Sequence, residues 1–358
     1  MRPQAHLPTL DGWRAIAIAA VLVCHTPFPS HSMQSWQEHG SLGVDLFFGI
    51  SGLLITHRLL EEHEKEGGIS LSAFYIRRAF RILPPAALYL ITISILSLLN
   101  IIETSWIRIT AAALFFRNYY VRADPSDWFS GHFWSLSVEE HFYLIWPFLL
   151  LLMGIPRARK LTPWIALAVA GWRTLDSHLH LVSAPSLRYL LIRTDYRIDG
   201  LLWGCVAALL LHQPQWRQRL QKIPASWPFV AIPIIVALSV YRPPQCMVAM
   251  AVLFPTLIVS SLLHPTNWVA RTLEVRPMRF LGTISYGLYL WQQLFLIRDR
   301  QPVFGVLQVF PLNIAAAVGV AWLSYRFLEE PLRQVGRHAV RRLGDAPPPK
   351  IAVAAATS

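Results

Sequence analysis

Long apolar segments alternate with short polar segments along almost the whole chain. A transmembrane helix needs about 20 predominantly apolar residues, and about ten segments approach this length. The pattern therefore predicts an all-α membrane protein, a bundle of about ten transmembrane helices. The predicted spans cover residues 10–26, 42–60, 84–102, 135–153, 161–175, 197–212, 227–241, 245–263, 280–297 and 302–327.

One further apolar segment, residues 106–116, is too short to cross a bilayer. Charged residues, among them Arg117 and Asp124, follow it directly. A full crossing at this point would also move the basic residues 156–160 to the outer face. We therefore predict one short interfacial or re-entrant helix near residues 106–116, on the outer side.

Lysine and arginine in the connecting segments set the orientation, because cytoplasmic loops contain an excess of positive charge. The loop 27–41 has no lysine or arginine, which indicates the outer face. Both termini are then predicted to be cytoplasmic. We expect a transmembrane domain over residues 1–332 and, over 333–358, a tail that is first basic and then disordered. The other basic segments that set this orientation are 61–81, 156–160, 215–222 and 271–279.

The composition supports a multi-pass integral membrane protein in the lipid bilayer. Hydrophobic residues make up 54% of the 358 and charged residues only 15%, whereas a soluble domain has about 25% charged residues. The net charge of +12 does not indicate nucleic-acid binding, because the basic residues occupy short segments between spans. The three cysteines, Cys24, Cys205 and Cys246, lie in apolar runs without metal-ligand spacing, so we predict no metal site.

Two polar residues in the first predicted span stand out. Arg14 and His25 are eleven positions apart, so on a helix they share nearly one face and are separated by about 16 Å. Ionisable groups inside a membrane helix are costly and by default mark a function. The predicted orientation places Arg14 toward the cytoplasm and His25 toward the outer face.

Other predicted spans place polar side chains in the same outer half as His25. Glu139 should lie at about its depth, on one helical stripe with Ser135 and Tyr143. The remaining polar residues of this layer are Asp45, Arg197, Asp199 and Gln292.

Glycines in the span 42–60 permit close approach of a neighbouring helix.

Each of these signals also has a structural explanation. His25 could serve only packing or an interhelical hydrogen bond, and Glu139 could cap a helix N-terminus. Arg197 and Asp199 could pair with each other. Arg77, Arg78 and Arg81 could be a topology signal or a contact to phospholipid headgroups.

The available chemistry favours group transfer. A neutral imidazole beside a carboxylate suits a general base, and the sequence has no G-x-S-x-G nucleophile elbow. This leaves proton abstraction from an acceptor hydroxyl by His25, or an acyl-histidine intermediate. Arg77, Arg78 and Arg81 at the cytoplasmic side suit a donor rich in phosphate groups, because guanidinium binds phosphate bidentately.

The motifs in this order resemble acyltransferase family 3, bacterial membrane O-acyltransferases that modify cell-surface and other sugars. The resemblance runs from Leu10 to about Pro331. Its motifs are the Arg14 and His25 pair, Gly40 to Phe48 with Ser51 and Gly52, Arg77 to Arg81, Phe133 to Tyr143, Arg197 to Asp199, Ser285 to Trp291, and Glu329 to Pro331.

The resemblance implies a ten-helix membrane fold, acetyl-CoA or another acyl-CoA as co-substrate, and essential roles for His25, Arg14 and Glu139. No bound cofactor is expected. One departure is Gln292, where the family often has histidine, and glutamine cannot exchange a proton near neutral pH. Residues expected to bind the acceptor or support the site are Asp45, Trp134, Ser137, Arg197, Asp199, Tyr286 and Gln292.

We therefore predict an O-acyltransferase of a bacterial plasma (inner) membrane. It would move an acetyl or other short acyl group from cytoplasmic acyl-CoA to a hydroxyl of a carbohydrate or glycosylated acceptor. His25 would be the general base or transient acyl carrier, and Arg14 with Arg77, Arg78 and Arg81 would bind the donor. The alternative is a transporter or flippase of a lipid-linked sugar that uses the same polar layer as a pathway.

Overall fold

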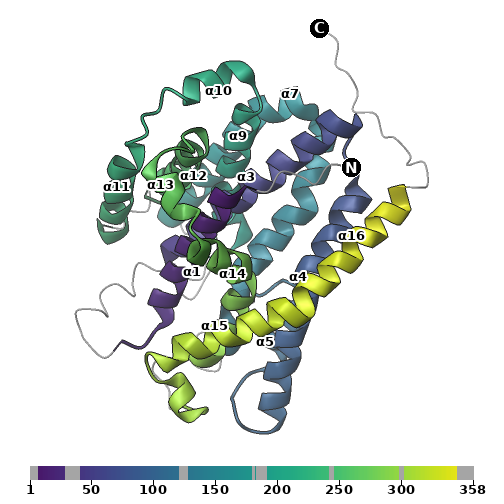
Figure 1. Ribbon diagram of the computed structural model, residues 1–358, viewed down its shortest axis with the longest axis vertical. Coiled ribbons are helices and arrows are strands. Elements are labelled where there is room, and N and C mark those ends of the chain that lie inside the picture. Colours follow the sequence, from purple (N-terminus) through teal and green to yellow (C-terminus); the bar gives the residue numbers. More distant parts are fainter. Residues whose placement is uncertain are drawn as a thin grey trace.

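The computed structural model describes residues 7–28, 41–120, 128–179, 182, 192–241, 246–297 and 302–344. Within these ranges every regular element is a helix and no strand is present (Figure 1). The longer helices are α1 (Pro8–His25), α3 (Ser41–Glu66), α4 (Leu71–Leu98), α7 (Phe133–Leu179), α9 (Thr194–Leu211), α11 (Trp227–Tyr241), α12 (Cys246–Leu263), α14 (Arg276–Phe295), α15 (Leu312–Ser324) and α16 (Glu330–Gly344). The shorter ones are α5 (Trp106–Ala113), α6 (Trp128–Gly131), α10 (Pro214–Leu220), α13 (Trp268–Leu273), the 3₁₀ turn η3 (Gly305–Gln308) and the π-helical turn η4 (Tyr325–Glu329).

Four helical segments of the described ranges are long and apolar enough to cross a membrane: Leu42–Glu66, Leu71–Leu98, Trp128–Asp176 and Cys246–Leu263. Large apolar side chains are also exposed along α4, with Ile91, Ile95 and Leu98 each at least half exposed. Exposed apolar surface of this kind is typical of contact with lipid. The protein is thus an all-helical membrane protein, as predicted. The count of about ten spans and the cytoplasmic location of both termini stay predictions.

The segment 61–81, which we expect to connect two spans, is mostly helical. Helix α3 continues to Glu66 and α4 already begins at Leu71, so the arginines at 77, 78 and 81 lie within a helix. The early start has a local cause, because the Ser70 side chain accepts from the Ala73 amide at 3.3 Å and caps α4. Glu62 accepts from the Ser70 amide at 2.8 Å and from the Arg77 guanidinium at 2.8 Å. These contacts close a tight connection between the two helices.

The predicted spans 135–153 and 161–175 lie in the two halves of α7, and no loop separates them. The predicted basic loop at 156–160 is helical. Gly154 alone breaks the helix, with φ 71° and ψ 155°. Glycine adopts a positive φ without the steric penalty of a side chain, so one residue suffices to redirect the chain. Pro156 follows, and proline suits the first turn of the second half.

The segment near residues 106–116 and the basic C-terminal segment are both helical. Helix α5 has eight residues and a length of about 12 Å, so the expected short helix is present. Helix α16 contains the basic residues of the predicted tail and packs along α4 (Figure 1). Gly336 allows this approach, because a Cβ there would meet the Phe80 Cβ at 2.8 Å. Residues 345–358, which we expect to be disordered, lie outside the described ranges.

Glycines bring three helices of the bundle into backbone contact, as expected for the span 42–60. A Cβ on Gly43 would lie 2.3 Å from the Ala17 carbonyl oxygen of α1. A Cβ on Gly52 would lie 1.9 Å from the Leu201 carbonyl oxygen of α9. Helix α3 is thereby fixed between α1 and α9, the two helices that contain Arg14, His25 and Arg197.

The contact at Gly52 can be tested with an alanine substitution. Gly52→Ala should destabilise the protein by about 1–3 kcal/mol, because the added methyl overlaps a backbone carbonyl that cannot move alone. Gly171 on α7 is the matched control, since no atom lies within 4 Å of a Cβ added there. Gly171→Ala should keep or raise stability, because alanine is the better helix former. Thermal unfolding in detergent measures both, and equal unfolding temperatures would contradict the close contact.

Candidate active site

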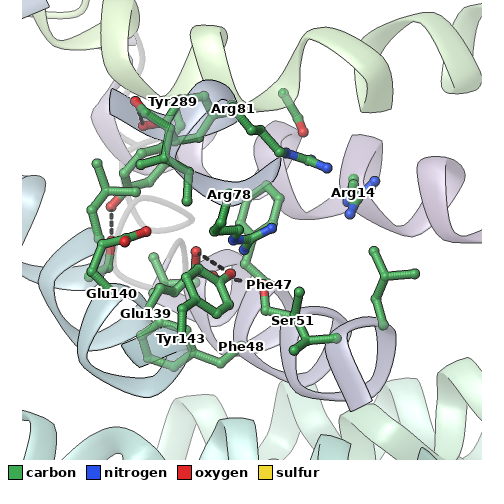
Figure 2. Close-up of a pocket in the computed structure, with 18 residues that line it drawn as sticks. Arg14, Phe47, Phe48, Ser51, Arg78, Arg81, Glu139, Glu140, Tyr143 and Tyr289 are labelled. Atoms are coloured by element: carbon green, nitrogen blue, oxygen red, sulfur yellow. Dashed lines mark hydrogen bonds between the residues drawn. The ribbon is translucent and has the colours of Figure 1, made fainter. Parts of the chain in front are cut away.

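A cavity opens between α1, α3, α4, α7 and α14 (Figure 2). Its apolar wall includes Val44, Phe47, Phe48 and Leu54. Charged and hydroxyl side chains from all five helices complete it. They are Arg14, Ser51, Arg78, Arg81, Ser135, Glu139, Glu140, Tyr143, Ser285, Tyr286 and Tyr289.

Glu139 is held in place at both oxygens. Its Oε1 accepts from the Ser51 hydroxyl at 2.9 Å, and its Oε2 accepts from the Tyr143 hydroxyl at 3.0 Å. Tyr143 lies one helical turn along α7, and the Arg78 guanidinium lies 3.5 Å from the centre of its ring. Figure 2 shows this group on one side of the cavity. The carboxylate is therefore an oriented hydrogen-bond acceptor beside a cation.

Arginines of α1 and α4 also line the cavity. Arg14 forms an ion pair with Asp11 at 3.2 Å, one turn back on α1. Arg78 and Arg81 also line the cavity, whereas Arg77 pairs with Glu62 at 2.8 Å. Three of the four predicted donor-site arginines are thus brought together, and the fourth has a partner at the α3–α4 connection.

Two further arginines, Arg58 and Arg333, belong to the same basic cluster but were missed by sequence reasoning. Arg58 lies within electrostatic range of Arg14, Arg78 and Arg333. Arg81 lies within range of the same three and of Arg58. Arg333 stood among the basic residues interpreted as a topology signal, and only the packing of α16 on α4 brings it within electrostatic range of Arg58 and Arg81. Arg58 had a sequence signal, because it lies near the end of the predicted span 42–60, and a charge in a membrane span by default marks a function, as for Arg14.

The cluster has few protein partners. In the part of the chain that the structure describes, Arg58, Arg78 and Arg81 make no ion pair and no side-chain hydrogen bond to protein. These three side chains are partly buried, so water can supply only some of the hydrogen bonds that a charged group needs. Guanidinium groups in this state are suited to an anionic ligand, and phosphate is the group that they bind bidentately.

His25 is not among the residues that line this cavity. Its Nδ1 lies 2.9 Å from the Val21 carbonyl oxygen, and its ring meets Trp128 edge-on at 5.7 Å between centroids. Because a carbonyl only accepts, Nδ1 donates the proton of the neutral ring and Nε2 carries the lone pair. The orienting contact expected from Glu139 is therefore made by Val21, and Glu139 gives its oxygens to Ser51 and Tyr143 instead.

The alternative in which Arg197 and Asp199 pair with each other is wrong. Arg173 of α7 binds Asp199 through two hydrogen bonds of 2.9 and 3.1 Å, and Arg197 forms an ion pair with Asp45 of α3. Residues two apart on a helix do not face each other, so neighbouring helices supply the partners. Arg197 also lies against the ring of Trp134 at 5.5 Å, which places Asp45, Trp134 and Arg197 together.

The remaining predicted residues are distributed around the cavity and the layer behind it. Tyr286 lines the cavity and donates to the Ile82 carbonyl at 3.0 Å. Ser137 is buried and donates to the Phe133 carbonyl of its own helix at 2.9 Å. Gln292 is fully buried, and its amide donates to the Gln293 side chain at 2.7 Å. Among the described residues no cluster of histidine, cysteine and carboxylate side chains has metal-binding geometry.

Fold and site together define a membrane protein with a basic, carboxylate-containing cavity inside a helical bundle. The chain belongs to the acyltransferase family described as "Acyltransferase domain", which matches residues 7–326. The resemblance to acyltransferase family 3 is thereby confirmed.

Two relatives show how far this similarity extends. The "Peptidoglycan O-acetyltransferase OatA" of Listeria monocytogenes serovar 1/2a is 30% identical over 366 residues, covering 93% of this chain and 57% of the relative. The "O-acetyltransferase OatA" of Staphylococcus aureus strain NCTC 8325 / PS 47 is 29% identical over 369 residues, covering 94% and 58%. This chain thus spans less than two thirds of the length of these relatives. No solved structure shows a significant match.

The buried pair of Arg173 and Asp199 predicts a strong effect of removing one partner. Asp199→Ala should destabilise the protein by about 3–5 kcal/mol, because it leaves Arg173 buried without a counter-charge. Asp195→Ala is the control on the same helix, since Asp195 pairs with Arg193 at a partly exposed site and should contribute less than about 1 kcal/mol. Replacing both members, as Arg173→Met with Asp199→Leu, should recover most of the loss. Thermal unfolding distinguishes these cases, and an unchanged unfolding temperature for Asp199→Ala would contradict the structural role.

Proposed function

We propose that this protein transfers an acetyl or other short acyl group from acyl-CoA to a hydroxyl of a carbohydrate or glycosylated acceptor. The observation that supports it most is the cavity, where Arg78 and Arg81 make no ion pair and no side-chain hydrogen bond among the described residues and lie beside an oriented Glu139. Arg58, within electrostatic range of Arg78, makes none either. Membership of the acyltransferase family and the names of its O-acetyltransferase relatives support the reaction class.

The arginine cluster suits the donor. Coenzyme A contains several phosphate groups, and each guanidinium offers a planar pair of N–H donors that matches two phosphate oxygens. On the predicted orientation this cluster faces the cytoplasm, where acyl-CoA is made. Arg14, Arg58, Arg78, Arg81 and Arg333 would bind the phosphates, with Arg77 supporting the connection through Glu62.

The acyl transfer itself is assigned to His25, by one of two routes. As general base, Nε2 takes the proton of the acceptor hydroxyl while its oxygen attacks the thioester carbonyl carbon. The carbon–sulfur bond then breaks, and the thiolate of coenzyme A takes up a proton. As acyl carrier, Nε2 attacks the thioester carbon first and the carbon–sulfur bond breaks to release the thiolate of coenzyme A. The acceptor oxygen then attacks the acyl group, the bond to Nε2 breaks, and the hydroxyl proton passes to the thiolate. The Val21 carbonyl favours both routes by keeping the proton on Nδ1.

Helix α1 connects the proposed donor-binding site with the proposed catalytic residue His25. Arg14 and His25 lie on its one face about 16 Å apart, and only Arg14 lines the described cavity. The donor's phosphates would therefore bind at one end of α1 and its thioester would react toward the other. Transfer of label from radioactive acetyl-CoA to a membrane acceptor distinguishes this function from a transporter or flippase, which leaves the acceptor unlabelled.

The donor assignment predicts a specific effect of Arg58. Arg58→Gln should raise the KM for acetyl-CoA by about 10- to 100-fold, because one charge-assisted contact to phosphate contributes about 1.5–3 kcal/mol. The maximal rate at saturating donor should change much less. Arg217→Gln on α10 is the matched control, because it removes the same charge from an exposed position. A normal KM in Arg58→Gln would remove Arg58 from the donor site.

The assignment of His25 predicts a loss of catalysis without loss of fold. His25→Ala should lower the transfer rate at least about 100-fold, the usual contribution of a general base. His338→Ala on the exposed face of α16 is the control and should be fully active. Transfer of radiolabel from acetyl-CoA and thermal unfolding should be measured on the same purified samples. Normal transfer by a folded His25→Ala variant would exclude His25 as base or acyl carrier.

A further inference from the structure

His132 is a buried histidine for which the proposed mechanism gives no role. It follows α6 directly and is only 4% exposed. Neither of its ring nitrogens has a hydrogen-bond partner in the described part of the chain. Aromatic rings surround it instead, with centroids of Tyr89, Phe133 and Tyr289 at 5.2, 5.0 and 5.5 Å. A phenylalanine would fit this environment better than an imidazole.

Three other buried polar atoms without a hydrogen-bond partner lie on α6 and α14. They are the Ser130 hydroxyl of α6, and the Trp291 indole nitrogen and Gln292 amide oxygen of α14. The Tyr89 ring joins the two sides, since it packs against His132 at 5.2 Å and against Trp291 at 5.5 Å. An unpaired buried donor or acceptor destabilises a protein by about 1–3 kcal/mol. Several in one place indicate a polar ligand or water that completes them.

This group lies between the cavity and His25. The backbone carbonyl of His132 accepts from the hydroxyls of Ser135 at 3.2 Å and Tyr289 at 3.0 Å, both of which line the cavity. On the other side, Trp128 of α6 meets the ring of His25 at 5.7 Å. Because His132 follows α6 directly, the short segment that contains it also contacts the residue to which the chemistry is assigned.

The chemistry of the group differs from that of the donor side. It contains uncharged donors and acceptors between aromatic rings, whereas a phosphate-rich ligand requires cations. Neutral polar atoms set in an apolar wall are typical of sites for uncharged polar ligands. Hydroxyl groups of a sugar can both donate to Gln292 and accept from an imidazole or an indole.

We propose that His132 is an acceptor-binding residue whose ring nitrogens bind hydroxyl groups of the carbohydrate, with Ser130, Trp291 and Gln292 completing the subsite. This inference rests on the proposed function, because it names where the acceptor of that reaction binds. The acceptor hydroxyl would thereby be presented beside Nε2 of His25.

His132→Phe separates this role from a structural one. Phenylalanine keeps the aromatic packing and removes both unpaired nitrogens, so the unfolding temperature should stay the same or rise. Membranes with the variant, incubated with radiolabelled acetyl-CoA, should label their endogenous acceptor at least tenfold less than membranes with the unsubstituted protein. Binding of labelled acetyl-CoA to the purified variant should be unchanged. His132→Gln retains a donor and an acceptor and should recover part of the transfer.

Three other outcomes would each overturn the role proposed for His132. Normal acceptor labelling by His132→Phe would overturn the role of His132 and leave the proposed function intact. A lowered unfolding temperature with transfer reduced only in proportion to the folded protein would assign His132 a structural role and overturn the inference. Absence of acceptor labelling by the unsubstituted protein would overturn the proposed function and this inference together.

Discussion

The free energy of an ionised side chain among apolar helices is the constraint on which this structure depends. A charge removed from water must find a counter-charge or a hydrogen-bond partner. Arg173 and Arg197 meet this requirement with Asp199 and Asp45, and each pair joins two helices. Charge neutralisation thus also fixes how α7 and α3 pack on α9, while Gly52 sets the distance between α3 and α9.

The same constraint gives the cavity its functional meaning. The carboxylate of Glu139 and the arginine guanidinium groups differ in their protein partners. Both oxygens of Glu139 are held by protein hydroxyls, whereas Arg58, Arg78 and Arg81 make no ion pair and no side-chain hydrogen bond among the described residues. The anionic group is fixed in position, and the cationic groups are available to an anionic ligand. His132 packs against Tyr289, which lines the cavity. Its ring nitrogens have no hydrogen-bond partner among the described residues, and they are suited to an uncharged polar ligand.

Helix α1 combines these two environments in one rigid element. It packs closely against α14 and α3, with backbone contacts at Gly282 of α14 and Gly43 of α3. Arg14 near one end belongs to the arginine cluster, and His25 at the other end lies against Trp128. A rigid helix keeps the distance between two sites constant, which a reaction between an extended donor and a second substrate requires.

The sequence alone determined the features that depend on local pattern. Apolar length and helical periodicity predicted the all-α membrane fold and the short helix at Trp106–Ala113, because these properties need no distant partner. They also selected Arg14 and Glu139, since a charge in an apolar run is conspicuous by itself. Only the tertiary structure decided the partners of these charges. Arg197 and Asp199 pair with other helices, Arg333 reaches the cluster through the packing of α16, and His25 is oriented by Val21 rather than by Glu139. Partner choice depends on which helices adjoin and at what distance, and this is fixed by the packing of the whole bundle.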